Sequence, residues 1–281
     1  MLKRLILLAV QVTTALWFAT ASAETLVERG EYLVTGPAGC GNCHSPLGPD
    51  GFIKGKELAG RLVEKNEAFT AIAPNITPAS RVAKWSDEEL GRSIREGIRP
   101  DGTIIGPPMP FPMYRGISDD DLAAIVAYLR TVPAVAQDNP ASTYNIPLPP
   151  AYGPPVTSVA SVSKSDKIKY GEYLAGPIAH CMECHTPFGP KGPMLGTDLG
   201  RGGFEFHGPW GTSVASNLTS HADGLANWSD EELITMISSG KRPDGSPMLP
   251  PMPYPFLAKT TRQDLEAMVA YLRTLPPLPD K

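Results

Sequence analysis

The stretch Cys40-Gly41-Asn42-Cys43-His44 recurs in pattern as Cys181-Met182-Glu183-Cys184-His185, so C-x-x-C-H occurs twice in a chain of 281 residues. The two motifs use all four cysteines of the sequence. Two thiols three residues apart lie on one helical turn, where each can add across a vinyl group of a porphyrin, and the adjoining histidine then faces the iron. The pattern therefore predicts two covalently attached haem c groups. The predicted attachment residues are Cys40, Cys43, Cys181 and Cys184, and the predicted iron ligands are His44 and His185.

Other uses of paired cysteines have to be compared with this one. A single C-x-x-C also suits a thioredoxin-like dithiol or half of a zinc site. A disulfide within each pair would close a very small loop and would constrain the chain little. Two copies in similar surroundings, with no cysteine to spare, favour haem attachment over these alternatives.

The N-terminal residues are typical of an export signal. Lys3 and Arg4 precede an apolar run from Leu5 to Phe18, and Ala21-Ser22-Ala23 follows it. This order predicts a signal peptide over residues 1–23 with cleavage before Glu24. A retained membrane anchor is the alternative, but the run is short for a membrane span and polar residues interrupt it. We therefore expect a periplasmic protein whose mature chain has no integral membrane segment.

Composition narrows the class of protein further. Hydrophobic residues make up 42% of the chain, which argues against both a disordered and a polytopic membrane protein. The formal net charge is −4, which argues against nucleic acid as a partner and favours partners with basic docking patches.

A tandem repeat organises the sequence. The repeated segments share their order and nearly constant spacing: Gly30–Leu33 with Gly171–Leu174, Trp85–Leu90 with Trp228–Leu233, Arg99–Gly102 with Arg242–Gly245, Pro107–Pro110 with Pro250–Pro253, and Ala127–Thr131 with Ala270–Thr274. The duplication predicts two domains, at residues 24–132 and 166–281. Residues 133–165 between them are rich in proline, which predicts an extended, semi-rigid linker along the surface of both domains, with no packed element.

Each repeat is expected to form helices joined by irregular loops. One helix precedes each C-x-x-C-H, and we expect its inward residues to be Leu26, Tyr32 and Leu33 in the first repeat and Ile168, Tyr173 and Leu174 in the second. Capping boxes predict the starts of two further helices, at Ser86 and Ser118 and at their counterparts Ser229 and Thr261. The last helix of each repeat carries apolar residues at helical spacing, namely Leu122, Ile125, Val126 and Leu129, or Leu265, Met268, Val269 and Leu272.

The second iron ligand of each site decides what the iron can do. The repeat selects Met109 and Met252, because each lies at the same place inside Pro-Pro-Met-Pro. A methionine sulfur makes the iron six-coordinate and raises its reduction potential. His207 or His221 is the alternative ligand in the second repeat, whereas His180 lies too close to Cys181 to reach the opposite face.

Asparagine and threonine also recur, at Asn75 and Thr77 and at Asn217 and Thr219. Two interpretations are open for these residues and for Trp85 and Trp228. They fix loops, or they lie near haem propionates, where buried carboxylates need hydrogen-bond donors.

The repeated motifs resemble those of class I c-type cytochromes in their dihaem bacterial form. Each repeat is similar to modules in cytochrome c subunits of periplasmic alcohol, aldehyde and related dehydrogenases. The resemblance implies an all-α fold of two tandem class I cytochrome c domains with His/Met ligation. It also implies electron transfer between redox partners such as a dehydrogenase, an oxidase or a mobile cytochrome, without catalysis by this chain. A dihaem redox enzyme, peroxidase-like or thiosulfate-oxidising, is the alternative; no cysteine is spare to act as its unusual ligand, and both repeats offer the same Met-Pro loop.

Overall fold

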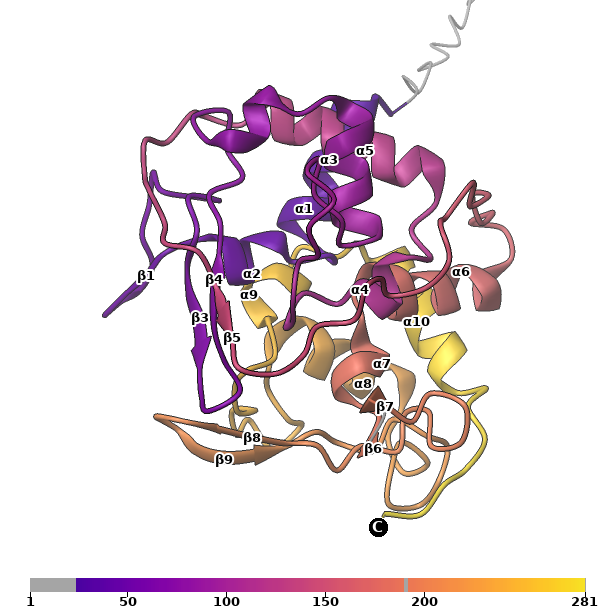
Figure 1. Ribbon diagram of the computed structural model, residues 1–281. Coiled ribbons are helices and arrows are strands. Elements are labelled where there is room, and N and C mark those ends of the chain that lie inside the picture. Colours follow the sequence, from indigo (N-terminus) through magenta and orange to yellow (C-terminus); the bar gives the residue numbers. More distant parts are fainter. Residues whose placement is uncertain (1–23, 190–191, 281) are drawn as a thin grey trace, which may run out of the picture.

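The computed structural model describes residues 24–189 and 192–280 (Figure 1). The expected signal peptide therefore lies outside the described residues. Within the described part of the chain, no helix is both long enough and apolar enough to cross a membrane.

Both repeats build the same series of helices. In the first repeat they are α1 (Leu26–Thr35), α2 (Cys40–His44), α3 (Asp87–Arg95), α4 (Phe111–Tyr114) and α5 (Asp119–Thr131), with the 3₁₀ turn η1 (Arg81–Lys84) before α3. In the second they are α6 (Lys167–Tyr173), α7 (Cys181–Cys184), α8 (Asp230–Ser239), α9 (Tyr254–Leu257) and α10 (Arg262–Leu272), with the π-helical turn η2 (Leu174–Ile178) after α6.

The first and last helices of each repeat pack at a glycine. A Cβ atom placed on Gly30 would lie 1.9 Å from the Ala124 carbonyl oxygen, so α1 touches the backbone of α5 directly. A Cβ atom on Gly171 would lie at the same 1.9 Å from the Ala267 carbonyl oxygen, between α6 and α10. Since only glycine permits such an approach, the repeated Gly-Glu-Tyr-Leu segment sets this helix crossing.

The predicted helix starts are partly confirmed. Ser86 and Ser229 form complete capping boxes with Glu89 and Glu232. Ser118 and Thr261 cap α5 and α10 through their hydroxyl oxygens, which accept the backbone N–H groups of Asp121 and Asp264. The carboxylates of these two aspartates do not complete a box, because they bind tyrosines of the other repeat.

The inward residues of the first helices are also partly as expected. Leu33 and Leu174 are fully buried, but Leu26 is 55% and Ile168 48% exposed. These two residues lie in the first turn of α1 and at the second position of α6, where the helices have not yet reached their partners.

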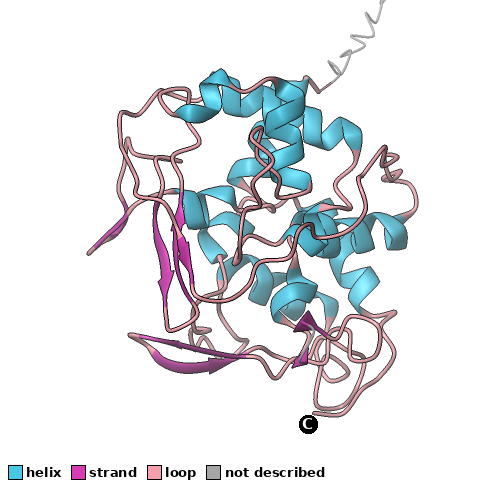
Figure 2. Cartoon of the chain, in the orientation of Figure 1, coloured by secondary structure: helices cyan, strands magenta, loops and turns pink. Residues whose placement is uncertain are grey.

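The expectation of an all-α fold is wrong. The described residues also form nine short strands in four small sheets (Figure 2). They are β1 (Leu47–Gly48), β2 (Gly51–Phe52), β3 (Arg61–Lys65), β4 (Phe69–Ala73) and β5 (Thr143–Tyr144), then β6 (Phe188–Gly189), β7 (Gly192–Pro193), β8 (Glu205–Gly208) and β9 (Gly211–Val214). Strands of only two to five residues leave no period-2 pattern long enough to detect.

The proline-rich stretch is not without secondary structure, since it contains β5. This strand pairs with β4, so the sheet of the first repeat has the order β3-β4-β5. Further along, the Tyr152 ring stacks on Phe111 at a centroid distance of 4.8 Å, and Ser158 donates to the Asp119 carboxylate at 2.6 Å. These contacts hold the stretch against the first repeat.

The two repeats share one hydrophobic core. Buried residues of both repeats, from Leu33 to Leu275, belong to a single cluster. Two equivalent hydrogen bonds cross between them, from Tyr32 to Asp264 and from Tyr173 to Asp121. The contact is therefore reciprocal: each repeat donates a tyrosine hydroxyl to an aspartate of the other repeat.

Candidate functional site

The short helices α2 and α7 carry the cysteine pairs. Each begins after a residue in the left-handed region, Gly39 at φ 56° and His180 at φ 40°. Glycine adopts this conformation without cost, whereas a residue with a side chain is strained by about 1–2 kcal/mol there. The same backbone turn thus precedes the first cysteine in both repeats, even though the residue that makes it differs.

The imidazole rings of His44 and His185 are fixed in the same way. The Nδ1 atom of His44 lies 2.8 Å from the Pro74 carbonyl oxygen, and that of His185 lies 2.7 Å from the Ser216 carbonyl oxygen. A carbonyl only accepts, so Nδ1 carries the proton and Nε2 keeps its lone pair. Burial lowers the pKa of both imidazoles, which favours the neutral form. This is the tautomer that a metal-ligating histidine needs.

The four thiols are half-buried. Burial raises the pKa of Cys40, Cys181 and Cys184 to about 12 and raises that of Cys43 as well. A raised pKa disfavours the thiolate, which is the nucleophile in dithiol exchange. The surroundings therefore argue against the thioredoxin-like interpretation.

The two methionines lie in loops of matching conformation. Met109 and Met252 are each half-buried, and each is followed by a proline with nearly equal dihedral angles: φ −82° and ψ 56° at Pro110, φ −84° and ψ 55° at Pro253. The carbonyl oxygens of Met109 and Met252 each accept a backbone N–H at 2.9 Å, from Phe111 and Tyr254 respectively. Their role as iron ligands stays a prediction. Because the two loops have the same conformation, the prediction applies equally to both repeats.

The two cysteine helices lie at the interface between the repeats. The Tyr114 ring, from α4 of the first repeat, packs edge-on against the His180 ring at a centroid distance of 5.8 Å, just before α7. In the opposite direction, the Phe256 ring of α9 leaves no room at Gly41 of α2, where a Cβ atom would lie 2.8 Å from the ring. Each C-x-x-C-H motif is thus covered by the short helix that follows the methionine loop of the other repeat (Figure 1).

Sequence reasoning missed this arrangement and the acidic residue within it. Glu183 lies inside the second motif, where burial raises the pKa of its carboxyl to about 7. Its carboxylate lies 3.6 Å from His180 Nδ1 and is close enough to Cys43 to raise the pKa of that thiol further. The signal available in the sequence was a charged residue, Glu183, at one of the two variable positions of the motif.

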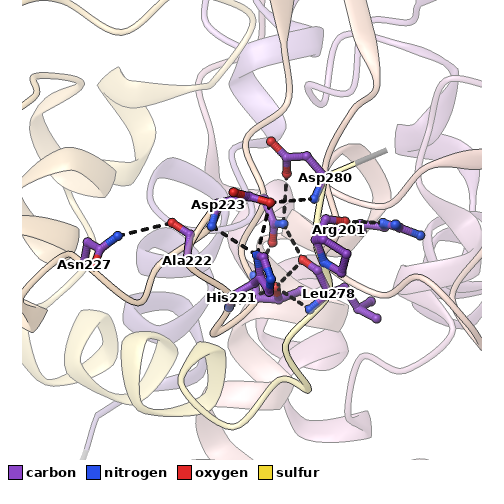
Figure 3. Close-up of polar contacts among 10 residues, drawn as sticks. Arg201, His221, Ala222, Asp223, Asn227, Leu278 and Asp280 are labelled. Carbon is purple, nitrogen blue, oxygen red and sulfur yellow. Dashed lines mark hydrogen bonds and ion pairs between the residues drawn. The ribbon is translucent and has the colours of Figure 1, made fainter.

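The competing residues have other partners. His207 is exposed and lies beside Thr212 and Glu205, and His221 pairs with Asp223 (Figure 3). These contacts agree with surface histidines rather than with ligands.

The repeated asparagines fix loops. The Asn75 amide donates to the carbonyl oxygens of Val135 and Gln137, and Asn217 donates to that of Leu278 and to the Asp280 carboxylate. Thr77 and Thr219 accept backbone N–H groups from the same segments. Both amides are therefore occupied by the segment that follows the last helix of their repeat.

The residues present fit a covalently attached haem. Each motif offers two half-buried thiols on one helical turn, beside an imidazole whose Nδ1 is held by a carbonyl oxygen. In addition, the Tyr254 hydroxyl, two residues after Met252, is buried and has no hydrogen-bond partner among the described residues. An unpartnered buried donor at this place indicates a polar group that the polypeptide itself does not supply.

Comparison with known proteins identifies the family. The cytochrome c family matches the chain twice, over residues 27–133 and 171–276. The protein belongs to the cytochrome c family, and its two matched copies fit binding of haem c in each repeat.

Relatives come from several bacteria. The chain is 33% identical to the cytochrome c subunit of the quinone alcohol dehydrogenase of Gluconobacter oxydans, over 92% of this chain and 56% of that subunit. It is 31% identical to the cytochrome c subunit of gluconate 2-dehydrogenase of Pantoea cypripedii, over 78% of this chain and 52% of that subunit. A dihaem c-type cytochrome of Cereibacter sphaeroides is 25% identical, over 85% of this chain and 82% of that protein. The chain thus spans little more than half the length of the dehydrogenase subunits it matches.

Proposed function

We propose that this protein is an exported dihaem cytochrome that receives electrons from a periplasmic dehydrogenase and passes them to a second redox protein. Cys40 and Cys43 would hold one haem c and Cys181 and Cys184 the other, with His44 and Met109, and His185 and Met252, as axial ligands. Haem c supplies one-electron chemistry at the iron, and its potential depends on the axial ligands.

The observation that carries the proposal is the equivalence of the two sites. Both histidines have the same tautomer, fixed by the same kind of carbonyl contact, and both methionine loops have the same backbone conformation. Two sites with both axial positions filled suit electron transfer, whereas a peroxidase-like enzyme needs one open position. The relatives named as dehydrogenase subunits support a dehydrogenase as the electron donor.

The packing between the repeats supports exchange of electrons within the chain. Tyr114 packs edge-on against His180, just before α7, and Phe256 packs against Gly41 of α2. Each attachment segment therefore packs against a side chain of the other repeat, which places both segments at the interface between the repeats.

The proposal is tested on the purified holoprotein by spectroelectrochemical titration combined with chemical haem determination. We expect two haems and two electrons per chain, with low-spin spectra in both oxidation states. Reduction is then followed after mixing with purified alcohol, gluconate or fructose dehydrogenase catalytic subunits and their substrates, and at least one of them should reduce the protein. A high-spin spectrum with turnover of hydrogen peroxide would contradict the proposal and support the enzyme alternative.

A further inference from the structure

One tyrosine of the proline-rich stretch lies against the Met109 loop, which comprises residues 105–111. The Tyr144 hydroxyl donates to the Pro107 carbonyl oxygen at 3.0 Å. The Tyr144 ring lies over Gly106 so closely that a Cβ atom there would be only 2.4 Å from it. Tyr144 therefore contacts two adjacent residues of the loop, one with its hydroxyl and the other with its ring, and both come shortly before Met109.

A second tyrosine of the same stretch contacts the loop at both of its ends. The Tyr152 hydroxyl donates to the Ile105 carbonyl oxygen at 2.8 Å. The Tyr152 ring stacks on the Phe111 ring, with 4.8 Å between the centroids and 28° between the ring planes, and the Phe111 side chain is fully buried. Since Ile105 precedes Met109 and Phe111 follows it, a single side chain of the stretch joins the two ends of the loop.

The backbone around Tyr144 is fixed by the sheet of the first repeat. Tyr144 belongs to β5, where it pairs with Phe69 of β4 (Figure 1). Two residues earlier, the Ser142 hydroxyl accepts the Ile72 N–H at 2.9 Å and donates to the Ile72 carbonyl oxygen at 3.2 Å. The sheet thus gives Tyr144 a fixed backbone from which its side chain reaches the Met109 loop.

The backbone after Tyr152 is held by two charged side chains of the first repeat. The Arg115 guanidinium donates to the Pro154 carbonyl oxygen, and the Val156 N–H donates to the Glu96 carboxylate at 3.4 Å. Glu96 and Arg115 are the C-cap residues of α3 and α4. Both tyrosines are therefore attached to regular structure of the first repeat through their backbone neighbours and to the loop through their side chains.

We propose that Tyr144 and Tyr152 are positioning residues of the first haem site, which hold the Met109 loop in place and so slow the release of the Met109 sulfur from the iron. The inference rests on the proposed function, in which Met109 is the axial ligand. Groups that orient a metal ligand from outside the coordination shell affect how firmly that ligand is held. A loop fixed at both ends loses little conformational entropy when its methionine binds. The proline-rich stretch is then part of the first site as well as the connection between the repeats.

Imidazole binding to the ferric holoprotein tests the proposal, because imidazole takes the axial position only after the methionine sulfur has left. At saturating imidazole, loss of the charge-transfer band of methionine-ligated haem is followed by stopped flow. Met109→Ala and Met252→Ala each remove one phase and so assign the phases to the two sites. We expect Tyr144→Ala and Tyr152→Ala each to accelerate the phase of the first site by about tenfold and to leave that of the second within about twofold.

Conservative variants separate the hydrogen bonds from the ring contacts. Tyr144→Phe and Tyr152→Phe keep the rings and lose only the hydroxyl bonds, so each should accelerate the first phase by about fivefold or less, and by less than the corresponding alanine variant. Ser158→Ala is the matched control. Ser158 lies in the same stretch, but its hydroxyl donates to Asp119, outside the Met109 loop, so both phases should stay within about twofold of the wild type.

Hydrogen exchange of the same holoproteins measures the loop without using the iron. The Ile105 N–H donates to the Gly97 carbonyl oxygen at 2.7 Å, and the Phe111 N–H donates to the Met109 carbonyl oxygen at 2.9 Å, so both amides report opening of the loop. In the two alanine variants we expect exchange at both amides to be about tenfold faster. The amides of α8, in the other repeat, should exchange as in the wild type and show that the fold is intact.

Unchanged imidazole kinetics in Tyr144→Ala and Tyr152→Ala would overturn the proposal. Equal acceleration at both sites would overturn it as well, because it would indicate general destabilisation rather than a loosened Met109 loop. The failure of the proposed function has a different signature. A wild-type protein with no methionine band at the first site would contradict the proposed ligand set, whereas a normal band with unchanged kinetics would contradict only the role of the two tyrosines.

Discussion

The Tyr32 hydroxyl donates a 2.6 Å hydrogen bond to the Asp264 carboxylate across the boundary between the repeats. Its counterpart Tyr173 donates to Asp121 at 2.7 Å in the opposite direction. Within its own repeat, Asp121 also binds the Arg29 guanidinium through two bonds of 2.8 and 2.9 Å. Each aspartate lies in the first turn of the last helix of its repeat. Each repeat therefore donates a hydrogen bond to the N-terminal end of that helix in the other repeat, where the helix dipole favours a carboxylate.

Removing these hydroxyls should weaken the association of the repeats. Tyr32→Phe and Tyr173→Phe each leave a buried carboxylate without one donor, and we expect each to lower the free energy of unfolding by about 1–3 kcal/mol. Tyr128→Phe is the matched control, because the Tyr128 hydroxyl makes no hydrogen bond within the described residues; it should cost less than about 0.5 kcal/mol. Chemical denaturation measures all three, and equal losses in Tyr32→Phe and Tyr128→Phe would show that the bond between the repeats contributes nothing.

The same tyrosines predict sensitivity to alkaline pH. Burial, and next the carboxylate partner, raise the pKa of Tyr32 and Tyr173 above the ordinary value of 10.0. Above pH 10 a tyrosine of the unfolded chain loses its proton while the folded one keeps it, so the free energy of unfolding falls as the pH rises from 10 towards the folded pKa. Denaturation curves at pH 8 and pH 11 should therefore differ more for the wild type than for the Tyr32→Phe, Tyr173→Phe double variant. Parallel losses in both proteins would exclude these tyrosines as the cause.

The glycines between the first and last helices allow a test within each repeat. Gly30→Ala or Gly171→Ala places a methyl group against a carbonyl oxygen, so the helices must separate, at a cost of about 3 kcal/mol or more. Gly176→Ala is the control, because its Cβ atom would meet nothing within 4 Å. Thermal unfolding should show a large drop in Tm for the first two variants and little change for the third. A Gly30→Ala protein as stable as the control would mean that α1 and α5 do not pack this closely.

The helices could be predicted from the sequence and the strands could not, and the reason is physical. Capping boxes and apolar spacing act within one helix, so the start of α3 at Ser86 and the apolar face of α5 could be assigned without knowing the rest of the fold. Ile125, Val126 and Leu129 on that face are indeed buried. The strand β5 depends on a partner far away in the chain, and nothing near Thr143 marks it.

Contacts between the repeats could not be predicted from the sequence for the same reason. Repetition marked Tyr32 and Tyr173 as important, but it suggested that each packs inside its own repeat. Only the folded chain shows that the Asp121 carboxylate binds Tyr173 instead of completing the expected capping box. The same holds for Tyr114 and Phe256, each of which packs beside the cysteine helix of the other repeat.

The axial methionines give the sharpest test of the two sites. Met109→Ala should remove the charge-transfer band of a methionine-ligated ferric haem from one site, and Met252→Ala should remove it from the other, so each variant should keep about half of the wild-type band. The midpoint potential of the altered site should fall, because a methionine sulfur raises the potential of the iron. Met113→Ala and Met248→Ala are the controls: both residues are half-buried and lie within four residues of Met109 or Met252, but neither aligns with a methionine in the other repeat. These controls should keep the whole band. An unchanged spectrum in Met252→Ala, with loss of the band in Met248→Ala, would move the ligand of the second site to Met248 and remove the equivalence on which the proposed function rests.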